Sequence, residues 1–321
     1  MRVLVTGGAG AIGSHVVDAL LARSDEVGVL DSFHDFYPRG EKERNLARAR
    51  ESAGFARLWE IDVRDADGVA HCLQELRPDA LIHLAARAGV RPSVLEPEEY
   101  MDVNVTGTAT VLNAAVRAGV ERLVFASSAS VYGARPRGPF VEDDRADRPL
   151  SPYGASKRSG ELLCHVFHST SGLPITCLRF FTAYGPRQRP DLAIHKFARL
   201  ALAGKPIPVF GDGSSERDFT FVSDLVDGIL RALDRAEGFR IYNLGSGGAV
   251  TLNETIAALE RALEIPVKRR VLPLQTGDLP RTWAAIELAR AELGYEPRVD
   301  LAEGLRHFVR WLREEGGCAS S

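Results

Sequence analysis

A doubly wound parallel β-sheet with helices on both faces, followed by a smaller C-terminal α/β domain, is the fold class that the sequence predicts. Short β-branched apolar segments alternate with amphipathic helical segments through the N-terminal half. A glycine-rich turn follows the first apolar segment, and turn-rich pieces replace the alternation after Tyr184. Strands that alternate with helices are typical of a parallel sheet whose two faces are both buried.

The apolar segments predict the strands in chain order, at residues 3–6, 27–30, 57–61, 80–84, 123–126 and 175–180. Amphipathic patterns predict helices at residues 12–22, 98–118 and 153–169. We expect residues 1–184 to form the larger domain, with residues 222–245 returning to its sheet, and residues 185–321 to form mainly the smaller one.

The composition excludes several classes of protein. The chain has 321 residues, of which 45% are apolar and 26% charged, so it can bury a sizeable core. Its formal charge of -3 does not provide the basic field that nucleic acids or membrane surfaces require, and we expect neither as a partner. No signal-peptide pattern precedes the first strand and no apolar run is long enough to cross a membrane, which predicts a cytoplasmic protein.

The cysteines indicate neither a disulfide framework nor a metal site. Cys72, Cys164, Cys177 and Cys318 lie far apart, with no Cys-x-x-Cys pair and no histidine at ligand spacing. We expect reduced thiols and no bound metal.

The glycine-rich turn Thr6-Gly-Gly-Ala-Gly-Ala-Ile-Gly13 predicts a phosphate-binding loop. Gly7, Gly10 and Gly13 recur every three residues between a strand and a helix, where free N–H groups can hold a pyrophosphate that a side chain would block. Asp31 follows the second strand about twenty residues later, where a carboxylate can bond an adenosine ribose and would repel a 2′-phosphate. The pattern therefore predicts NAD rather than NADP.

Asp62 and Val63, which follow the third predicted strand, are placed to meet the adenine of such a cofactor. Asp62 could equally be a helix cap.

The stretch Ser151-Pro-Tyr-Gly-Ala-Ser-Lys157 predicts a catalytic helix. Pro152 suits a first helical turn, so Tyr153 and Lys157 share one helix face. A phenol has a pKa of about 10, and an ammonium about 5 Å away would favour the phenolate by about 3 kcal/mol at an effective dielectric of about 20. We interpret the pair as a general base, although this spacing alone is more often accidental.

A serine cluster supports that interpretation. Ser127, Ser128 and Ser130 stand at the end of the fifth strand, where open α/β sheets bind ligands. Their hydroxyls are placed to bond a sugar or alcohol oxygen.

Together these motifs resemble the extended short-chain dehydrogenases/reductases, specifically the NAD-dependent nucleotide-sugar epimerases and dehydratases. The resemblance runs from TGGAGAIGSH through HLAARAGVR, SSASVYG and YGASK to RDFTFVSD. It implies a Rossmann fold, NAD as cofactor, a UDP-sugar substrate and a homodimer built from the helices near residues 98–118 and 153–169. It implies Ser128, Tyr153 and Lys157 as the catalytic set, and further cofactor contacts from Ala11, Ile12, Leu84, Ala85, Ala86, Asn104 and Ser127.

The residues before Val131-Tyr-Gly favour one reaction within the family. Dehydratases and decarboxylases of the family carry an acidic residue there, whereas this chain has Ala129 and Ser130. The resemblance therefore implies epimerisation.

Residues 30–46 and 179–197 resemble the UDP-glucuronate 4-epimerase branch. In the second stretch, Thr182, Arg187 and Arg189 offer a hydroxyl and cations to a substrate carboxylate. The two arginines could instead bind the diphosphate or border a solvated loop. The resemblance implies diphosphate and ribose contacts for Arg217, Asp278 and Arg281, and a substrate contact for Arg91.

Two positions depart from the family pattern: Ala11 replaces a usual Phe and Ala285 a common Asp. The leading hypothesis is a UDP-glucuronate 4-epimerase. The alternatives are a 4-epimerase of a neutral UDP-hexose such as UDP-glucose or UDP-GlcNAc, a UDP-glucuronate decarboxylase, and a non-catalytic NAD-binding sensor or scaffold.

Overall fold

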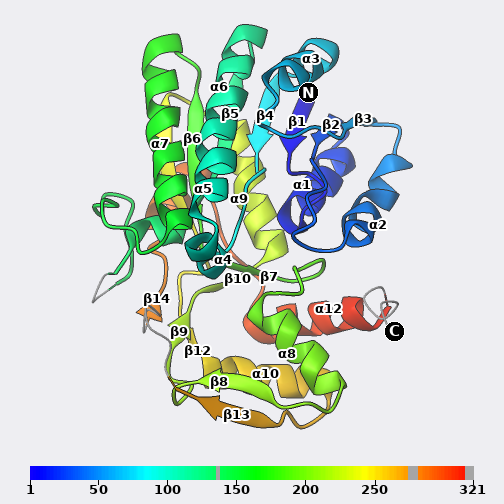
Figure 1. The fold of residues 1–321 in the computed structure, drawn as a ribbon, viewed down its shortest axis with the longest axis vertical. Helices are drawn as coiled ribbons and strands as arrows, with labels where there is room; N and C mark the ends of the chain where they lie inside the picture. The colour runs from blue at the N-terminus through cyan, green and yellow to red at the C-terminus, as the bar shows by residue number, and fades with distance from the viewer. Residues whose placement is uncertain (135–137, 274–280, 315–321) are drawn as a thin grey trace.

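The computed structural model describes residues 1–134, 138–273 and 281–314. Its centre is a seven-stranded sheet in the order β11-β6-β5-β4-β1-β2-β3 (Figure 1), in which every pairing is parallel. The strands are β1 (Arg2–Thr6), β2 (Glu26–Leu30), β3 (Phe55–Trp59), β4 (Ala80–His83), β5 (Arg122–Ser128), β6 (Ile175–Phe180) and β11 (Phe239–Leu244). The predicted doubly wound sheet is confirmed.

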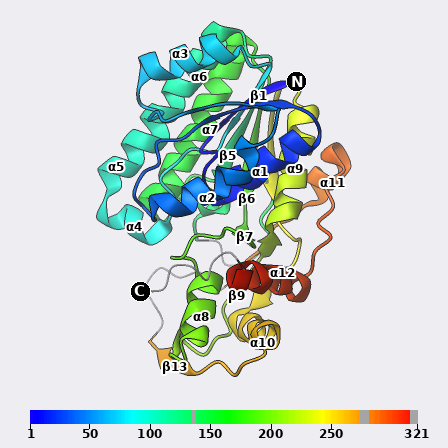
Figure 2. The ribbon, with the colours of Figure 1, turned by 90° about the vertical axis from the view of Figure 1, so that its right-hand side faces the viewer.

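Helices cover both faces of this sheet (Figure 2). The helices α1 (Ala11–Ala22), α2 (Arg39–Arg50) and α9 (Val222–Asp234) lie on one face, and α3 (Ala66–Leu76), α6 (Gly107–Ala118) and α7 (Pro152–Ser171) lie on the other. Val3 and Val5 belong to one hydrophobic core, whereas Leu4 between them belongs to the second. Successive side chains of a strand point to opposite faces, so a continuous apolar strand serves both cores.

The direction of the winding reverses beside β1. Thr6 pairs with Leu30 of β2 on one side and with His83 of β4 on the other. The residues that follow these three strands therefore meet at one edge of the sheet. Open α/β sheets bind ligands in the crevice at this position.

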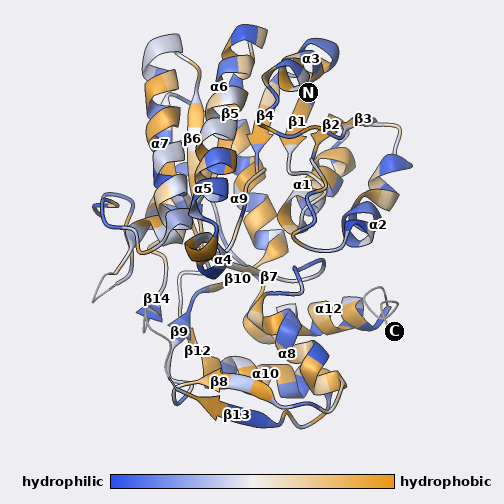
Figure 3. Cartoon of the chain, viewed as in Figure 1, coloured by the Kyte–Doolittle hydropathy of each residue, from blue (hydrophilic) through white to orange (hydrophobic). Residues whose placement is uncertain are grey.

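The C-terminal part forms the lower half of Figure 1. Its helices are α8 (Ala193–Leu202), α10 (Leu252–Leu263) and α12 (Leu301–Glu314), whereas α11 (Glu287–Leu293) lies beside α9 (Figure 2). Its short strands pair as β8 (Ile207–Phe210) with β13 (Arg269–Leu272), β7 (Thr182–Tyr184) with β10 (Phe219–Phe221), and β9 (Glu216–Arg217) with β12 (Val250–Thr251) and β14 (Arg281–Thr282). The apolar faces of these elements belong to the same hydrophobic core as α1 and α9. Figure 3 shows apolar faces alternating with polar faces along these elements.

Several elements differ from the sequence expectations. The helix expected at 98–118 consists of α5 (Pro97–Met101), a π-helical turn at Asp102–Thr106, and α6. The strand expected at 57–61 is β3, two residues earlier. The helix α2 was not expected because its buried residues include Lys42 and Asn45, which break the apolar period. The short helix α4 (Val90–Leu95) was not expected either.

Cys72, Cys164 and Cys177 are buried free thiols, and Cys318 lies outside the described residues. Within the described ranges, no helix combines the length and apolarity needed to cross a membrane.

Candidate active site

A cavity of about 630 Å³ opens at the carboxyl ends of the sheet strands, between the sheet and the C-terminal part. Most of the predicted site residues line it. They are Gly7, Gly10, Ala11, Ile12, Gly13, Asp31, Asp62, Val63, Leu84, Ala85, Ala86, Arg91, Ser127, Ser128, Ser130, Tyr153, Lys157, Thr182, Arg189 and Arg217. The fold thus brings together residues from both halves of the chain.

The glycine loop shapes one end of the cavity with its backbone. Gly7 has a φ of +70°, and a Cβ added there would lie 2.7 Å from the Ala85 nitrogen. A Cβ on Gly13 would lie 2.1 Å from the Gly7 carbonyl oxygen. Because α1 begins directly after Gly10 without a side-chain cap, its first N–H groups remain available to an anion. The loop fits the pyrophosphate of a dinucleotide.

Asp31 is held in place at the end of β2. Its carboxylate accepts hydrogen bonds from the backbone N–H of Ala9, at 3.1 Å, and of Phe33, at 2.8 Å. The Lys42 ammonium lies 3.6 Å away. The oxygens are therefore fixed where they line the cavity, in reach of a polar ligand group.

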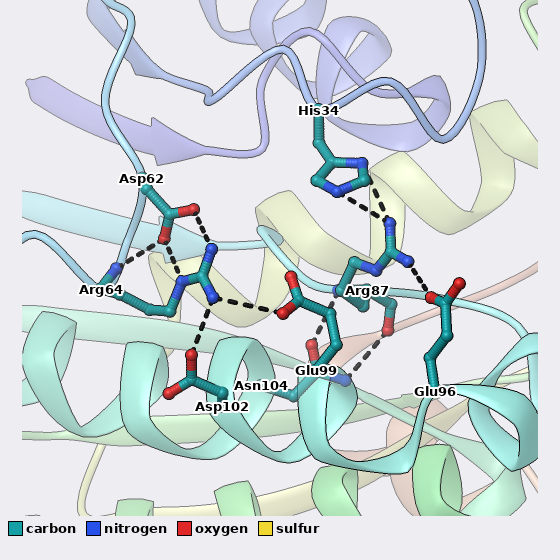
Figure 4. Close-up of polar contacts among 8 residues, drawn as sticks. All are labelled: His34, Asp62, Arg64, Arg87, Glu96, Glu99, Asp102 and Asn104. Atoms are coloured by element: carbon teal, nitrogen blue, oxygen red, sulfur yellow. Dashed lines mark hydrogen bonds and ion pairs between the residues drawn. The ribbon is translucent and has the colours of Figure 1, made fainter.

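The Asp62 carboxylate is bound by Arg64 through both oxygens (Figure 4), and this hydrogen bonding lowers the pKa of Asp62. The suggestion that Asp62 caps a helix is wrong, because Asp65 caps α3 by accepting from the Gly68 N–H at 3.0 Å.

Tyr153 stands in the first turn of α7, which begins at Pro152 as expected. Ser151 caps this helix by accepting from the Gly154 N–H at 3.0 Å. Burial raises the pKa of Tyr153, while its hydrogen bond with Ser128 and the charge of Arg189 act in the opposite direction. The phenol is therefore placed beside the predicted hydroxyl.

Lys157 lines the cavity with Tyr153 and bonds the end of β5. Its Nζ donates to the Ala126 carbonyl at 2.8 Å and lies over the Phe125 ring at 5.1 Å. Burial lowers its pKa to about 8. In the described structure the groups that lower the pKa of Tyr153 are Ser128 and Arg189, and the effect of the lysine charge on the phenol stays a prediction. Helical spacing puts both residues on one face, but the long lysine side chain reaches the end of β5.

Ser127 rests on a buried ion pair behind the cavity. Its hydroxyl donates to Glu161 at 2.6 Å, and Arg179 binds the same carboxylate at 2.8 and 2.9 Å. Glu161 and Arg179 are each at most 2% exposed. Because the Ser127 hydroxyl donates its only hydrogen to Glu161, its oxygen can only accept a hydrogen bond from a ligand.

The other end of the cavity carries the expected carboxylate-binding side chains. Thr182 begins β7, and Arg189 follows in the next loop. The Arg189 guanidinium donates to both oxygens of Asp191, at 3.0 and 2.9 Å, and lies over the Phe36 ring at 4.9 Å. A substrate carboxylate would compete with Asp191 for this guanidinium.

Three expected residues do not line the cavity. Arg187 lies 2.8 Å from Asp18 on α1. Arg281 pairs with Glu216 and stacks on Trp283. Asn104 is buried against the backbone of residue 87. Asp278 lies outside the described residues.

Sequence reasoning also missed cavity residues. His34, Phe36, Tyr37, Lys42 and Arg87 all line it. They lie at residues 30–46 and 83–91, two stretches that resemble the family. That resemblance was the signal from which these residues could have been predicted to line the site. Sequence alone does not say which side chains of a loop point inward.

Comparison with known proteins identifies the family. Residues 3–245 match the model of the NAD dependent epimerase/dehydratase family. The chain belongs to this family.

Named relatives of this epimerase/dehydratase extend over nearly its whole length. A UDP-glucuronate 4-epimerase of Thermodesulfobacterium geofontis is 39% identical, with 97% of this chain and 96% of that protein covered. The crystal structure of UDP-glucuronic acid 4-epimerase from Bacillus cereus, in complex with UDP-glucuronic acid and NAD, has a TM-score of 0.91 and 35% identity and covers 98% and 99% of the two chains. UDP-glucose 4-epimerase from Thermotoga maritima, with UDP-glucose, has a TM-score of 0.90 and 32% identity, with 98% and 99% covered.

Proposed function

We propose that this protein interconverts UDP-glucuronate and UDP-galacturonate by NAD-dependent inversion at C4, through a transient 4-keto intermediate. One observation carries the proposal: a single cavity joins the glycine loop to the Tyr153–Ser128 pair and to Arg189. The relatives named for this reaction support it across the whole chain.

The dinucleotide would be held by the glycine loop, Asp31 and the residues after β3. When bound, NAD supplies a positively charged ring that accepts the C4 hydride and returns it to the other face of the sugar. Tyr153 removes the proton of the C4 hydroxyl and Ser128 bonds the same oxygen. Because burial raises the pKa of Tyr153, the reaction depends on cationic groups to favour the phenolate.

The substrate carboxylate requires its own binding group. The 4-keto intermediate of a uronic acid is a β-keto acid, which loses carbon dioxide when the breaking C–C bond aligns with the carbonyl π system. Thr182 and Arg189 line the cavity. Thr182 offers a hydroxyl, and Arg189 offers a planar guanidinium whose N–H groups can bond both oxygens of a carboxylate. Holding the carboxylate there keeps that bond out of alignment.

The nucleotide would bind at the C-terminal part. Arg91 and Arg217 line the cavity and can pair with the diphosphate. Residues 1–184 with 222–245 then act as the cofactor-binding domain, and residues 185–321 act mainly as the substrate domain. Asp278 and Arg281 stay in the proposal as nucleotide contacts on the strength of the resemblance.

Three other functions compete with this one. A 4-epimerase of a neutral UDP-hexose is favoured by the similarity to the Thermotoga enzyme. A decarboxylase is disfavoured because Ala129 and Ser130 stand where an acid is expected. A non-catalytic NAD sensor would need the glycine loop but not Tyr153, Ser128 and Lys157 together.

One assay separates these functions. Purified protein is incubated with UDP-glucuronate, and nucleotide sugars and carbon dioxide are measured. We expect UDP-galacturonate and no carbon dioxide. Turnover of UDP-glucose alone would reject the substrate, release of carbon dioxide with a UDP-pentose would reject the reaction, and inertness with both sugars would favour the sensor.

We also propose a cytoplasmic homodimer that buries the outer faces of α5, α6 and α7. Leu162 and Val166 on α7 are 54% and 53% exposed, and Leu95 nearby is 84% exposed. Contiguous apolar side chains on a surface are typical of an interface. Light scattering of the purified protein tests this, and a monomeric mass at micromolar concentration would contradict it.

A further inference from the structure

Arg87 is the centre of a polar cluster that neither the motifs nor the proposed reaction explains. Figure 4 shows its guanidinium between His34 and Glu96, and Asn104 bonded to the Arg87 backbone. We name this cluster, formed by Arg87, His34, Phe36 and Glu96, the Arg87 clasp. Arg87 lines the same cavity as the glycine loop, Asp31 and Asp62.

The base of the clasp is rigid. Asn104 in the π-helical turn accepts from the Arg87 N–H at 2.7 Å and donates to the Arg87 carbonyl at 2.9 Å. Asn104 also donates to the Ser156 hydroxyl on α7 at 2.9 Å. Arg87 itself is only 9% exposed. Its backbone is therefore fixed to the catalytic helix layer, and only the guanidinium reaches outward.

The guanidinium joins three segments of the chain. Its Nη1 lies 3.0 Å from both ring nitrogens of His34, and its plane covers Phe36 at 5.4 Å from the ring centroid. Both residues belong to the segment that leads from Asp31 to α2. Its Nη2 donates to Glu96, the N-cap residue of α5. The buried Nε has no hydrogen-bond partner among the described residues.

We infer that Arg87 retains the bound dinucleotide by holding in place the segment after Asp31, whose residues His34, Phe36 and Tyr37 line the same cavity. The inference rests on the proposed use of NAD. A 4-epimerase returns the hydride to its own substrate, so its cofactor ends each turnover unchanged and need not leave. Holding this segment in place thus slows dissociation without limiting turnover.

The chemistry of His34 fits this role. Arginine only donates hydrogen bonds, so the imidazole must be neutral to accept one. Burial, followed by the charge of Arg87, lowers the pKa of His34. The other charged groups that face it are Asp35 on its own segment, Lys42 on α2 and Glu99 on α5. At neutral pH the contact is intact, and protonation of His34 in acid removes the acceptor and adds repulsion.

The test measures cofactor release directly. Protein loaded with radiolabelled NAD is mixed with excess unlabelled NAD, and the retained label is followed by rapid filtration. We expect Arg87→Gln to accelerate release by about tenfold or more, because the variant loses the charged hydrogen bonds that hold the segment in place. Glu96→Gln, which changes a side chain that is 54% exposed, gives a smaller acceleration in the same direction.

Asp227→Asn is the matched control, because it removes a partly exposed ion pair with Arg231 on α9, a helix that contributes no residue to the Arg87 clasp. Its release rate should equal that of the wild type. Wild-type release should accelerate as the pH falls, and His34→Asn should flatten that profile.

Unchanged release from both Arg87→Gln and Glu96→Gln would overturn the inference, and if Arg87→Gln does not fold, the Glu96 variant decides alone. A raised KM for UDP-glucuronate with unchanged NAD release would also overturn it, in favour of substrate binding. Release is measured without turnover, so a failure of the proposed reaction leaves this test intact.

Discussion

The two ends of the cavity are built by different means. At the dinucleotide end the backbone makes the shape, and an added Cβ at Gly7 or Gly13 would meet main-chain atoms at 2.7 and 2.1 Å. At the proposed sugar end the cavity is lined by reactive side chains, those of Ser128, Tyr153 and Arg189. Substitutions at the first end should therefore change what fits, and substitutions at the second should change what reacts.

The largest effect is expected at the sugar end. Tyr153→Phe removes the proton acceptor and should lower kcat with UDP-glucuronate by about 10²–10⁴-fold. NAD should stay bound, because the glycine loop is untouched. Turnover is measured by chromatography, and bound NAD is measured after denaturation.

Tyr100→Phe is the matched control for that change. The Tyr100 ring packs edge-on against Tyr153 at 6.3 Å, and its hydroxyl donates to the Ala88 carbonyl at 3.0 Å. Its removal should affect kcat far less. Near-normal turnover of Tyr153→Phe would remove the phenol from the role of base and undo the contrast between the two ends.

The next effect is expected at the dinucleotide end. Gly13→Ala pushes a methyl group into the Gly7 carbonyl, and overpacking of this kind costs about 1–3 kcal/mol. NAD affinity, measured by calorimetry, should fall by about tenfold to a hundredfold. Gly248→Ala is the control, since no atom lies within 4 Å of its added Cβ. Equal NAD affinity of both variants would show that backbone shape does not set this end.

A smaller effect is expected from Arg189→Gln. Hydrogen bonds to charged groups contribute about 1.5–3 kcal/mol, but this guanidinium must first leave Asp191, so the KM for UDP-glucuronate should rise by about tenfold only. Arg187→Gln removes a guanidinium that pairs with Asp18 outside the cavity and should leave KM near the wild-type value. The reverse ranking would show that the carboxylate binds at Arg187.

Local patterns predicted much of this molecule. The parallel sheet, the glycine loop and the start of α7 at Pro152 were all read from neighbouring residues. Strand periodicity, glycine spacing and helix capping act over a few residues, so the chain reveals them without its fold. The helix α2 was not predicted because two of its buried residues are polar: Lys42 lines the cavity and Asn45 donates to the Ala9 carbonyl at 3.0 Å.

Partners far apart in the chain could not be predicted. The Lys157 ammonium bonds the Ala126 carbonyl, thirty-one positions away, and its helical spacing from Tyr153 does not reveal this partner. Arg87 lies in a stretch that carried the family resemblance, but its contacts with His34 and Glu96 join segments that the sequence does not place together.

The chain therefore encodes its sheet, its phosphate loop and the presence of a tyrosine, a lysine and arginines near one another, because these depend on short-range sterics and hydrogen bonding. Which guanidinium faces the cavity, what the lysine bonds and how the segment after Asp31 is held in place depend on contacts between distant segments. Such contacts exist only once the strands have aligned, since burial and charge pairing are properties of the assembled interior.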